Sequence, residues 1–406
     1  MNEPEAVLAD APERRRDEQS PIRMLHVITR IVRGGADENT LYTVRGLDPR
    51  RYDVDLVVGA DSEPEGLIGL DPARVLTMSE LVRDPHPVKD VIALLKLAAL
   101  MRRGRYQIVH THTAKAGFLG RLAAALAGTP VIIHTVHGVT FHDHLPRWQS
   151  WFYLTLERIA ARFTDQFVTV GEDVKAIYLR HGIGQASAYQ TIYSGMPLAE
   201  YLEAGDMSDL ERAQVRRELG LEPRHQVVAM AARLEARKGH AYLFDAVARL
   251  RDRHPDLRVL ILGEGGDRTA LESRVREQGL DDIVRFLGHR LDLPRVLGAA
   301  DISVLTSLWE GLPRVLVQSA AAGKPILTFD VEGAWEVVRD GQNGFIVPTR
   351  DVGAFAERLG QMLQDRSRCD AMGRSGRARV TQEWTVETMV DRLDTLYQRC
   401  TSDRAA

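Results

Sequence analysis

The sequence predicts an α/β protein with two domains, each built on a doubly wound parallel β-sheet. Three observations lead to this fold class. Short, largely apolar and β-branched segments alternate with longer amphipathic segments, which is the order of strands and helices in such a sheet. The apolar runs are typical of strands that are buried on both faces. The alternation pauses once and then restarts, and a length of 406 residues suits two or three domains.

The first series of elements lies within residues 21–195, after a polar segment. Residues 1–20 are rich in Pro, Glu and Arg and have no apolar core, which predicts a disordered tail and no signal peptide. The expected strands are 27–31, 54–58, 108–110, 131–136 and 167–170. The expected helices are 36–46, 88–102, 116–127 and 148–162, and the later ones have apolar residues three and four positions apart.

The second series follows residues 196–209, whose glycine, proline and acidic residues predict a linker. The strands expected after it are 227–231, 258–262, 284–287, 302–305, 325–329 and 345–347, and helices are expected at 240–253 and 385–399. The chain therefore divides into the tail at 1–20, one domain at 21–195, a second at 196–380 and a C-terminal segment at 381–406.

The composition limits the cellular compartment in which we expect the protein and the classes of partner that we expect it to bind. The 53 basic and 56 acidic residues give a net charge of −3, which argues against a nucleic-acid-binding protein. Two cysteines, Cys369 and Cys400, are too few to staple a chain of this length, which favours a reducing compartment. The longest apolar run, 91–101, is far shorter than the ~20 residues that span a bilayer. We therefore expect a cytoplasmic protein, with peripheral membrane contact left open.

Two glycine-rich turns follow expected strands, where ligands bind in open α/β sheets. Gly34 and Gly35 would let backbone N–H groups approach an anion, and a tight strand-to-helix turn explains them equally well. Gly263 opens a second turn that resembles a dinucleotide fingerprint. The third glycine of that fingerprint would fall at Arg268, so the pattern argues against nicotinamide binding.

Charged residues follow two strands of the second half. Arg233 and Lys238 come after strand 227–231, where their side chains suit a diphosphate; the alternative is solvated surface charge. Glu310 follows strand 302–305 and precedes Pro313, a residue that suits the first turn of a helix. Its carboxylate would accept hydrogen bonds from ligand hydroxyls beside the free N–H groups of that helix, or it has only a structural role.

Six histidines fall within 35 positions, at His110, His112, His134, His137, His142 and His144. Such a cluster can bind zinc, but no cysteine and few carboxylates accompany it, so we expect these side chains to line a polar cleft. The Asp-x-Asp pair at 53–55 lies at the amino end of a strand, away from the expected site, and we interpret it as structural.

A basic segment raises the question of lipid binding. Residues 89–121 carry seven basic residues and one acidic residue, a local charge of +6, and aromatic residues lie nearby at 148 and 151–153. A segment of this kind either docks on anionic lipid or forms a solvated helix face.

Together these residues resemble the retaining glycosyltransferases of family 4, also described as bacterial glycosyl transferases group 1. The motifs that carry the resemblance occur in the family's order, namely the run HTHTAKAG at 110–117, Arg233 with Lys238-Gly239, the run FLG at 286–288, and the run EGLP at 310–313, which continues to GKP at 323–325. The resemblance implies the GT-B fold, with two Rossmann-like domains that face an interdomain cleft. The domain at 21–195 would bind the acceptor, the domain at 196–380 the donor, and a helix in 381–406 would cross back to the first domain.

The resemblance also implies roles for matching residues. Arg233 and Lys238 would hold the donor diphosphate and stabilise it as a leaving group. Glu310 would bind hydroxyls of the donor sugar, and His137 would line the pocket of that sugar. Together with these four catalytic residues, the donor-binding residues would be Gly34, Gly35, Gly263, Gly288, Gly311, Leu312 and Gln318.

Gln318 departs from the family pattern, in which a second Glu follows the first at this spacing and holds the ribose hydroxyls. A hydrogen bond to a charged group contributes about 1.5–3 kcal/mol against ~1 kcal/mol for a neutral one. We therefore expect weaker nucleotide binding or a changed nucleotide preference.

The resemblance implies transfer of a sugar, with retention, from a nucleotide diphosphate sugar to a glycan or a polyprenyl-linked acceptor. UDP-sugar is the expected donor, and no metal or other cofactor is expected. Two alternatives remain open: a nucleotide-sugar epimerase of the same fold, and a degenerate protein that binds a nucleotide sugar without catalysis.

Overall fold

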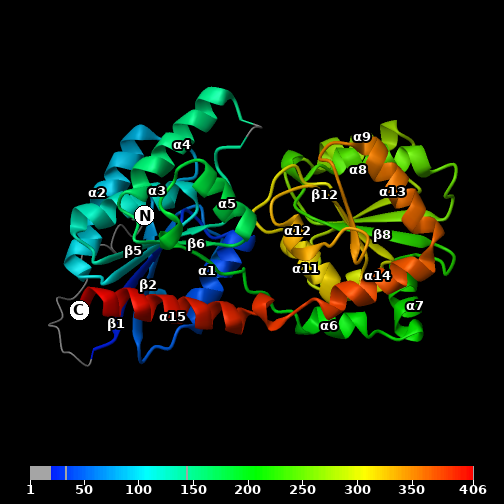
Figure 1. Cartoon of the computed structure of the whole chain (residues 1–406). Helices are drawn as coiled ribbons and strands as arrows, with labels where there is room; N and C mark the ends of the chain where they lie inside the picture. The colour runs from blue at the N-terminus through cyan, green and yellow to red at the C-terminus, as the bar shows by residue number, and fades with distance from the viewer. Residues whose placement is uncertain (1–19, 33, 143–144, 406) are drawn as a thin grey trace, which may run out of the picture. The chain divides into compact units, whose positions relative to one another are not determined.

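The computed structural model describes residues 20–32, 34–142 and 145–405, which form two compact units. Unit 1 comprises the described residues of Met1–Gly195 and Val386–Ala406, and unit 2 comprises Met196–Thr385. The expected tail at 1–20 lies, apart from Ser20, outside the described residues. Each unit has a single parallel sheet covered by helices, which confirms the α/β, doubly wound fold class (Figure 1).

Unit 1 contains a seven-stranded sheet in the order β3-β2-β1-β4-β5-β6-β7. The strands are β1 (Ile22–Val27), β2 (Tyr52–Gly59), β3 (Val75–Met78), β4 (Ile108–His112), β5 (Val131–Val136), β6 (Gln166–Thr169) and β7 (Tyr189–Thr191). The predicted first strand at 27–31 is wrong in its bounds, because β1 ends at Val27. Arg23 and His26 hide this strand from a search for apolar runs, yet both side chains have polar partners within the unit.

The helices of unit 1 cover both faces of its sheet. They are α1 (Gly35–Gly46), α2 (Pro87–Gly104), α3 (Ala114–Ala127), α4 (Arg147–Ala161), α5 (Glu172–Arg180) and α15 (Val386–Ala405). Figure 1 shows α2, α3 and α4 on one face and α1 and α15 on the other. The last helix begins at Val386 and buries Leu393, Leu396 and Tyr397 in the core of unit 1. Its apolar face therefore anchors the end of the chain to the first unit.

Unit 2 contains a six-stranded sheet in the order β10-β9-β8-β11-β12-β13. The strands are β8 (Gln226–Ala231), β9 (Leu257–Leu262), β10 (Val284–Gly288), β11 (Ile302–Leu305), β12 (Ile326–Phe329) and β13 (Gly344–Val347). The helices are α6 (Ala199–Gly205), α7 (Asp209–Glu218), α8 (His240–Leu250), α9 (Arg268–Glu277), α10 (Leu293–Ala299), α11 (Arg314–Ala321), α12 (Ala334–Val337), α13 (Val352–Gln364) and α14 (Arg366–Ala378).

The prediction of a linker at 196–209 is wrong. This segment begins unit 2 and forms helix α6, which packs against α10 and α11. Met196, Leu198 and Tyr201 are buried, and the Met196 amide donates a hydrogen bond to the Trp384 carbonyl over 2.9 Å. The glycine, proline and acidic residues of this segment suggested a linker. Its few apolar residues are spaced for one short helix, which is too short to give a clear helical pattern in the sequence.

The Asp-x-Asp pair on β2 is structural, as predicted. Asp53 and Asp55 pair with Arg23 at 3.3 and 3.2 Å, and Arg74 contacts both carboxylates at 2.5 and 3.1 Å. The Tyr106 hydroxyl donates to Asp55 over 2.6 Å. These partners bind strands β1 and β2 to the segment that precedes β3.

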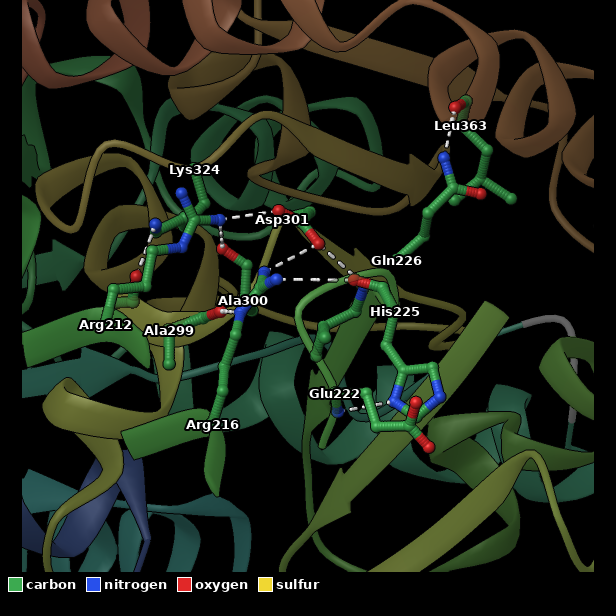
Figure 2. A network of polar contacts seen from close by, with 12 residues as sticks. Arg212, Arg216, Glu222, His225, Gln226, Ala299, Ala300, Asp301, Lys324 and Leu363 are labelled. Carbon is green, nitrogen blue, oxygen red and sulfur yellow. Dashed lines mark hydrogen bonds and ion pairs between the residues drawn. The ribbon is translucent and has the colours of Figure 1, made fainter. Parts of the chain in front are cut away.

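A largely buried cluster of charges joins helix α7 to the sheet of unit 2 (Figure 2). Asp301 accepts from Arg212 at 2.5 Å, from Arg216 at 2.8 Å and from the Val227 amide at 2.7 Å. Lys324 is also buried, and its ammonium group donates to the Gly298 carbonyl over 2.6 Å. Three cations therefore share one neighbourhood with Asp301.

Burial, together with the nearby charge of Arg212, lowers the pKa of Lys324 to about 7. Above pH 7 the unfolded chain still binds a proton at this lysine and the folded chain does not, so stability should rise with pH. The free energy of unfolding of the wild type should increase by up to about 1.4 kcal/mol per pH unit between pH 7.5 and 9.5. Lys324→Met should lose this contribution in denaturant titrations, and the control Lys175→Met on α5 should keep it. Equal slopes for all three proteins would contradict the assignment.

Candidate active site

The candidate site in unit 2 lies at the carboxyl ends of two paired strands, β8 and β11. Arg233 follows β8, and Lys238 ends the short 3-10 turn Ala236–Lys238 that leads into α8. Glu310 lies in the loop between β11 and α11. Because β8 and β11 are neighbours in the parallel sheet, their following loops meet at one edge.

The structure brings Lys238 and Glu310 together as an ion pair, between the ammonium group and Oε1 of the carboxylate. Arg237 approaches Oε2 of the same carboxylate at 3.7 Å. The Glu310 side chain is 9% exposed and that of Lys238 is 14% exposed, so the pair is largely removed from water. A carboxylate and two cations thus meet at the position expected for a diphosphate and a sugar.

The protonation of this pair follows from burial and charge. Burial alone would raise the pKa of Glu310, but the charges of Lys238 and Arg237 outweigh it and hold the pKa below its usual value. Burial lowers the pKa of Lys238, and the charge of Glu310 offsets that shift in part. Each charge therefore supports the other, and loss of either would leave a buried ion without its partner.

Arg233 lies beside this pair but is more open. Its side chain is 41% exposed and binds Glu235 at 2.5 Å, and Glu235 also accepts from Arg237 at 3.0 Å. Sequence reasoning missed Arg237 and Glu235, although both belong to the charged run that contains Arg233 and Lys238. The carboxylates hold the three cations close to one another, where they would otherwise repel.

Glycines allow the loops of this site to approach each other. Gly239 has φ of 69°, and a Cβ atom there would lie 2.0 Å from the Thr306 carbonyl oxygen at the end of β11. Gly263 has φ of 140°, and its Cβ would lie 2.1 Å from the Ala232 carbonyl oxygen. The Gly263 amide donates to the Gly288 carbonyl over 2.8 Å, which joins the ends of β9 and β10. Donor binding by Gly263 and Gly288 stays a prediction.

The segment after Glu310 is packed into unit 2. Gly311, Leu312 and Pro313 are buried, and Pro313 precedes the first residue of α11 rather than lying in its first turn. The Glu310 amide donates to Glu332 over 3.0 Å, a second carboxylate that the sequence did not single out. Gln318 is half-buried on α11, and among the described residues its side-chain amide has no hydrogen-bond partner.

Unit 1 places its predicted residues at the carboxyl ends of β1 and β5. Gly34 is the N-terminal cap of α1 and Gly35 its first residue, while Arg33 lies outside the described residues. His137 directly follows β5 and is half-buried. These positions suit contacts with a ligand at this edge of the unit 1 sheet.

Three of the other predicted histidines are buried and do not line a cleft, while His142 is half-buried. His110, His112 and His134 are buried in unit 1, and His144 lies outside the described residues. His110 bonds the Tyr397 hydroxyl and Thr135 Oγ1, both at 2.7 Å. The position of the strands explains this burial, because β4 lies at the centre of the sheet with a neighbouring strand on each side.

One geometric observation favours the alternative of a metal site. His26, His110 and His112 each offer a ring nitrogen, and these atoms lie within 4.8 Å of one another. Hydrogen bonds already engage both ring nitrogens of each histidine. A metal ion would have to replace these bonds, so the cluster fits a hydrogen-bonded core better.

Two family models match the chain and correspond to its two units. The model described as glycosyl transferase 4-like domain matches residues 34–193, and the model described as glycosyl transferases group 1 matches residues 211–379. The chain belongs to the glycosyltransferases that these two models together describe. Its sites at the strand ends of both units lie within the matched ranges.

Similar proteins agree with the family. This glycosyltransferase is 28% identical over 381 residues to UDP-Gal:alpha-D-GlcNAc-diphosphoundecaprenol alpha-1,3-galactosyltransferase of Escherichia coli. The aligned region covers 93% of this chain and 97% of that protein. It is 29% identical to the putative glycosyltransferase EpsD of Bacillus subtilis, over 76% of this chain and 82% of the relative. The solved structure of Anabaena Alr3699/HepE with UDP matches with a TM-score of 0.78 at 22% identity, over 93% of this chain and all of the other, and supports the GT-B fold.

The simple charge count of residues 89–121 overstates the positive charge that is free on the surface of unit 1, because several of these cations form ion pairs. Lys96 pairs with Glu80 at 2.7 Å, Lys115 with Asp90 at 2.6 Å, and Arg121 with the buried Glu157 at 2.8 Å. Three of the seven cations thus have acidic partners, two of which lie outside the segment that was counted. In the described part of the chain, every helix is too short or too polar to cross a bilayer.

Proposed function

We propose that this glycosyltransferase moves a sugar from a UDP-sugar to a lipid-linked or polysaccharide acceptor with retention at the anomeric carbon, and without a metal ion. The observation that carries the proposal is the buried Lys238–Glu310 pair with Arg237 and Arg233 beside it. Cations at the carboxyl ends of parallel strands suit a diphosphate, and a carboxylate among them suits sugar hydroxyls.

The bond between the anomeric carbon and the diphosphate oxygen breaks during transfer, and negative charge develops on the leaving UDP. Arg233 and Lys238 stabilise that charge where it forms. Glu310 accepts hydrogen bonds from hydroxyls of the sugar, and the backbone amides of Gly311 and Leu312 lie next to it in the loop. Gly35 and His137 are the residues of unit 1 for which we propose contact with the donor.

The acceptor hydroxyl attacks the anomeric carbon on the face that UDP leaves. Its proton passes to an oxygen of the leaving diphosphate, and the new glycosidic bond keeps the original configuration. This route uses no nucleophile from the protein. Transfer should persist in EDTA, and loss of transfer that magnesium or zinc restores would contradict the metal-free part of the proposal.

The choice of donor and acceptor draws on similar proteins. The Escherichia coli relative is named for UDP-Gal and a diphosphoundecaprenol acceptor, and HepE has been solved with UDP and with UDP-glucose. A transferase releases UDP only when an acceptor extract is present, an epimerase isomerises the donor without acceptor, and a binding protein does neither. Mass spectrometry of donor and products separates the three, and acceptor-independent isomerisation would overturn the proposal.

An exposed apolar surface on unit 1 supports contact with an anionic membrane. Val88, Val91, Ile92 and Leu95 are exposed on α2, at the spacing of one helix face, although α2 also buries its opposite face. Trp148 and Trp151 on α4 are 68% and 65% exposed. Both helices follow strands of one parallel sheet, so their N-terminal halves lie at the same end of unit 1. Basic residues in the first turns of the same two helices, Lys89 and Arg147, suit acidic headgroups.

Replacing both Trp148 and Trp151 by serine should weaken binding to vesicles that contain phosphatidylglycerol by about tenfold or more, because each buried aromatic contributes about 1.5–3 kcal/mol. Sedimentation with sucrose-loaded vesicles measures the effect. Leu291→Ser, at a highly exposed apolar residue of unit 2, is the matched control and should bind as the wild type does. Equal binding by all three proteins would exclude this surface.

A further inference from the structure

Two different loops of unit 2 hold Glu310, each at a different group. The carboxylate of Glu310 pairs with the ammonium group of Lys238, in the loop after β8, and its backbone amide donates to Glu332 Oε2 over 3.0 Å. Glu332 lies in the loop between β12 and α12. Strand β11, whose following loop carries Glu310, lies between β8 and β12 in the parallel sheet. The loops of both neighbouring strands therefore contact the same residue.

The loop of Glu332 packs directly against the residue that follows Glu310. Gly333 has φ of 76°, a conformation that favours glycine, and a Cβ atom there would lie 2.9 Å from the Gly311 carbonyl oxygen. Val331, on the other side of Glu332 in the chain, is buried, and so is Gly333. These neighbours fix the backbone of Glu332, so its carboxylate reaches the Glu310 amide from a well-packed segment.

Two hydrogen bonds set the course of the loop that carries Glu310. The Leu308 amide donates to the Arg237 carbonyl over 2.8 Å, and two residues later the Glu310 amide donates to Glu332. A carboxylate acceptor makes a hydrogen bond roughly twice as strong as a neutral acceptor does. Without this acceptor the Glu310 amide would turn toward water or another partner, and the Cα–Cβ bond of the same residue would turn with it.

We propose that Glu332 is a positioning residue for Glu310, and that its hydrogen bond to the Glu310 amide sets the orientation in which the Glu310 carboxylate meets hydroxyls of the donor sugar. The inference deepens the proposed function and rests on it for the role of Glu310. It adds a third loop, the one after β12, to a site built on the loops after β8 and β11. Because Glu332 acts through Glu310, its loss should weaken recognition of the sugar more than recognition of the nucleotide.

Hydrogen exchange of the full-length protein, measured by mass spectrometry on peptides from residues 306–313, tests the contact without any ligand. Glu332→Ala should remove one slowly exchanging amide from this segment, while the Leu308 amide keeps its backbone partner. Glu332→Gln retains an acceptor oxygen and should leave the segment protected. Asp330→Ala breaks a 2.8 Å contact with Trp335 Nε1 in the same loop and is the matched control, which should exchange as the wild type does. Unchanged exchange in Glu332→Ala would overturn the proposal.

Calorimetric titration with UDP, UDP-galactose and UDP-glucose tests the consequence for the sugar. Glu332→Ala should lower the affinity for the better-bound UDP-sugar relative to UDP by about three- to tenfold, because a displaced Glu310 loses part of its hydrogen bonding. Glu332→Gln and Asp330→Ala should keep this ratio within about twofold of the wild type. In Glu310→Ala, whose folding is checked by thermal unfolding, adding Glu332→Ala should change the ratio no further.

The outcomes separate positioning from other roles of Glu332. An equal loss of affinity for UDP and UDP-sugar in Glu332→Ala would indicate a general distortion of the site and would overturn the inference. A ratio in Glu332→Gln as low as in Glu332→Ala would assign the effect to the negative charge and would also overturn it. Absence of UDP binding by the wild type would instead count against the proposed function, and the exchange data would still decide whether Glu332 holds the loop.

Discussion

Replacing Lys238 by methionine should lower kcat/KM for sugar transfer by about 10²–10³-fold, the loss that follows removal of one preorganised charge-stabilising group. The lysine lies in a largely water-excluded site, where its charge acts on the leaving diphosphate with little screening. The change also leaves Glu310 without its ion-pair partner, so folding must be checked by thermal unfolding. UDP release with a competent acceptor extract measures the rate.

Two further variants make the result specific. Arg233→Met alters a more exposed side chain, carries little risk to folding, and should also lower kcat/KM by at least tenfold. Lys324→Met removes another buried lysine of unit 2 that lies in the charge cluster around Asp301, and it should change kcat/KM by no more than a few-fold. Rates within a few-fold of wild type for both Lys238→Met and Arg233→Met would remove the diphosphate assignment.

Lowering the pH from 7 to 5 should destabilise unit 1 strongly. Burial lowers the pKa of His26 to about 3 and those of His110, His112 and His134 well below the usual value of 6.5. The unfolded chain binds protons at these sites below pH 6.5 and the folded chain does not, so their stabilisation is present above pH 6.5 and is lost as the pH falls. Each histidine costs up to about 1.4 kcal/mol per pH unit, and four of them approach the whole stability of a typical domain within one or two units.

Hydrogen exchange measured by mass spectrometry at pH 7, 6 and 5, and corrected for the intrinsic rate, should show β1, β4 and β5 opening together as the pH falls. His110→Gln keeps a side chain that can bond Tyr397 and Thr135 and should reduce proton uptake on unfolding by about one between pH 6 and 5. His289→Gln, at an exposed position of unit 2, should leave the hydrogen exchange of β1, β4 and β5 unchanged. Protection in unit 1 that is constant from pH 7 to 5 would contradict neutral buried histidines.

The fold and part of the site were predictable because their signals are local in sequence. Strand 131–136 and strand 302–305 match β5 and β11 residue for residue, since apolar and β-branched residues dominate both. Arg233, Lys238 and Glu310 were singled out because each follows such a run, and the ends of parallel strands gather at one edge.

What the sequence left out depends on partners that are distant along the chain. The buried hydrogen bond between His26 and His112 arises from the register of β1 and β4, which spacing alone does not reveal. His26 was not singled out at all, and Arg23 and His26 together concealed β1 because polar residues in a central strand are rare. The approach of Arg237 to Glu310 likewise joins residues 73 positions apart, and no pattern in either segment predicts the contact.

The measurement that most directly tests the central claim, a UDP-binding site built on Lys238 and Glu310, is thermal unfolding with UDP, GDP and ADP for the wild type and Gln318→Glu. UDP should raise the melting temperature of both proteins, with a stabilisation of ~2.7 kcal/mol at 100 times the dissociation constant, and GDP and ADP should not. Gln318→Glu should bind UDP about two- to thirtyfold more tightly, because a charged acceptor replaces a neutral one. No shift with UDP in either protein would contradict the account, and a shift with GDP or ADP alone would assign a different donor.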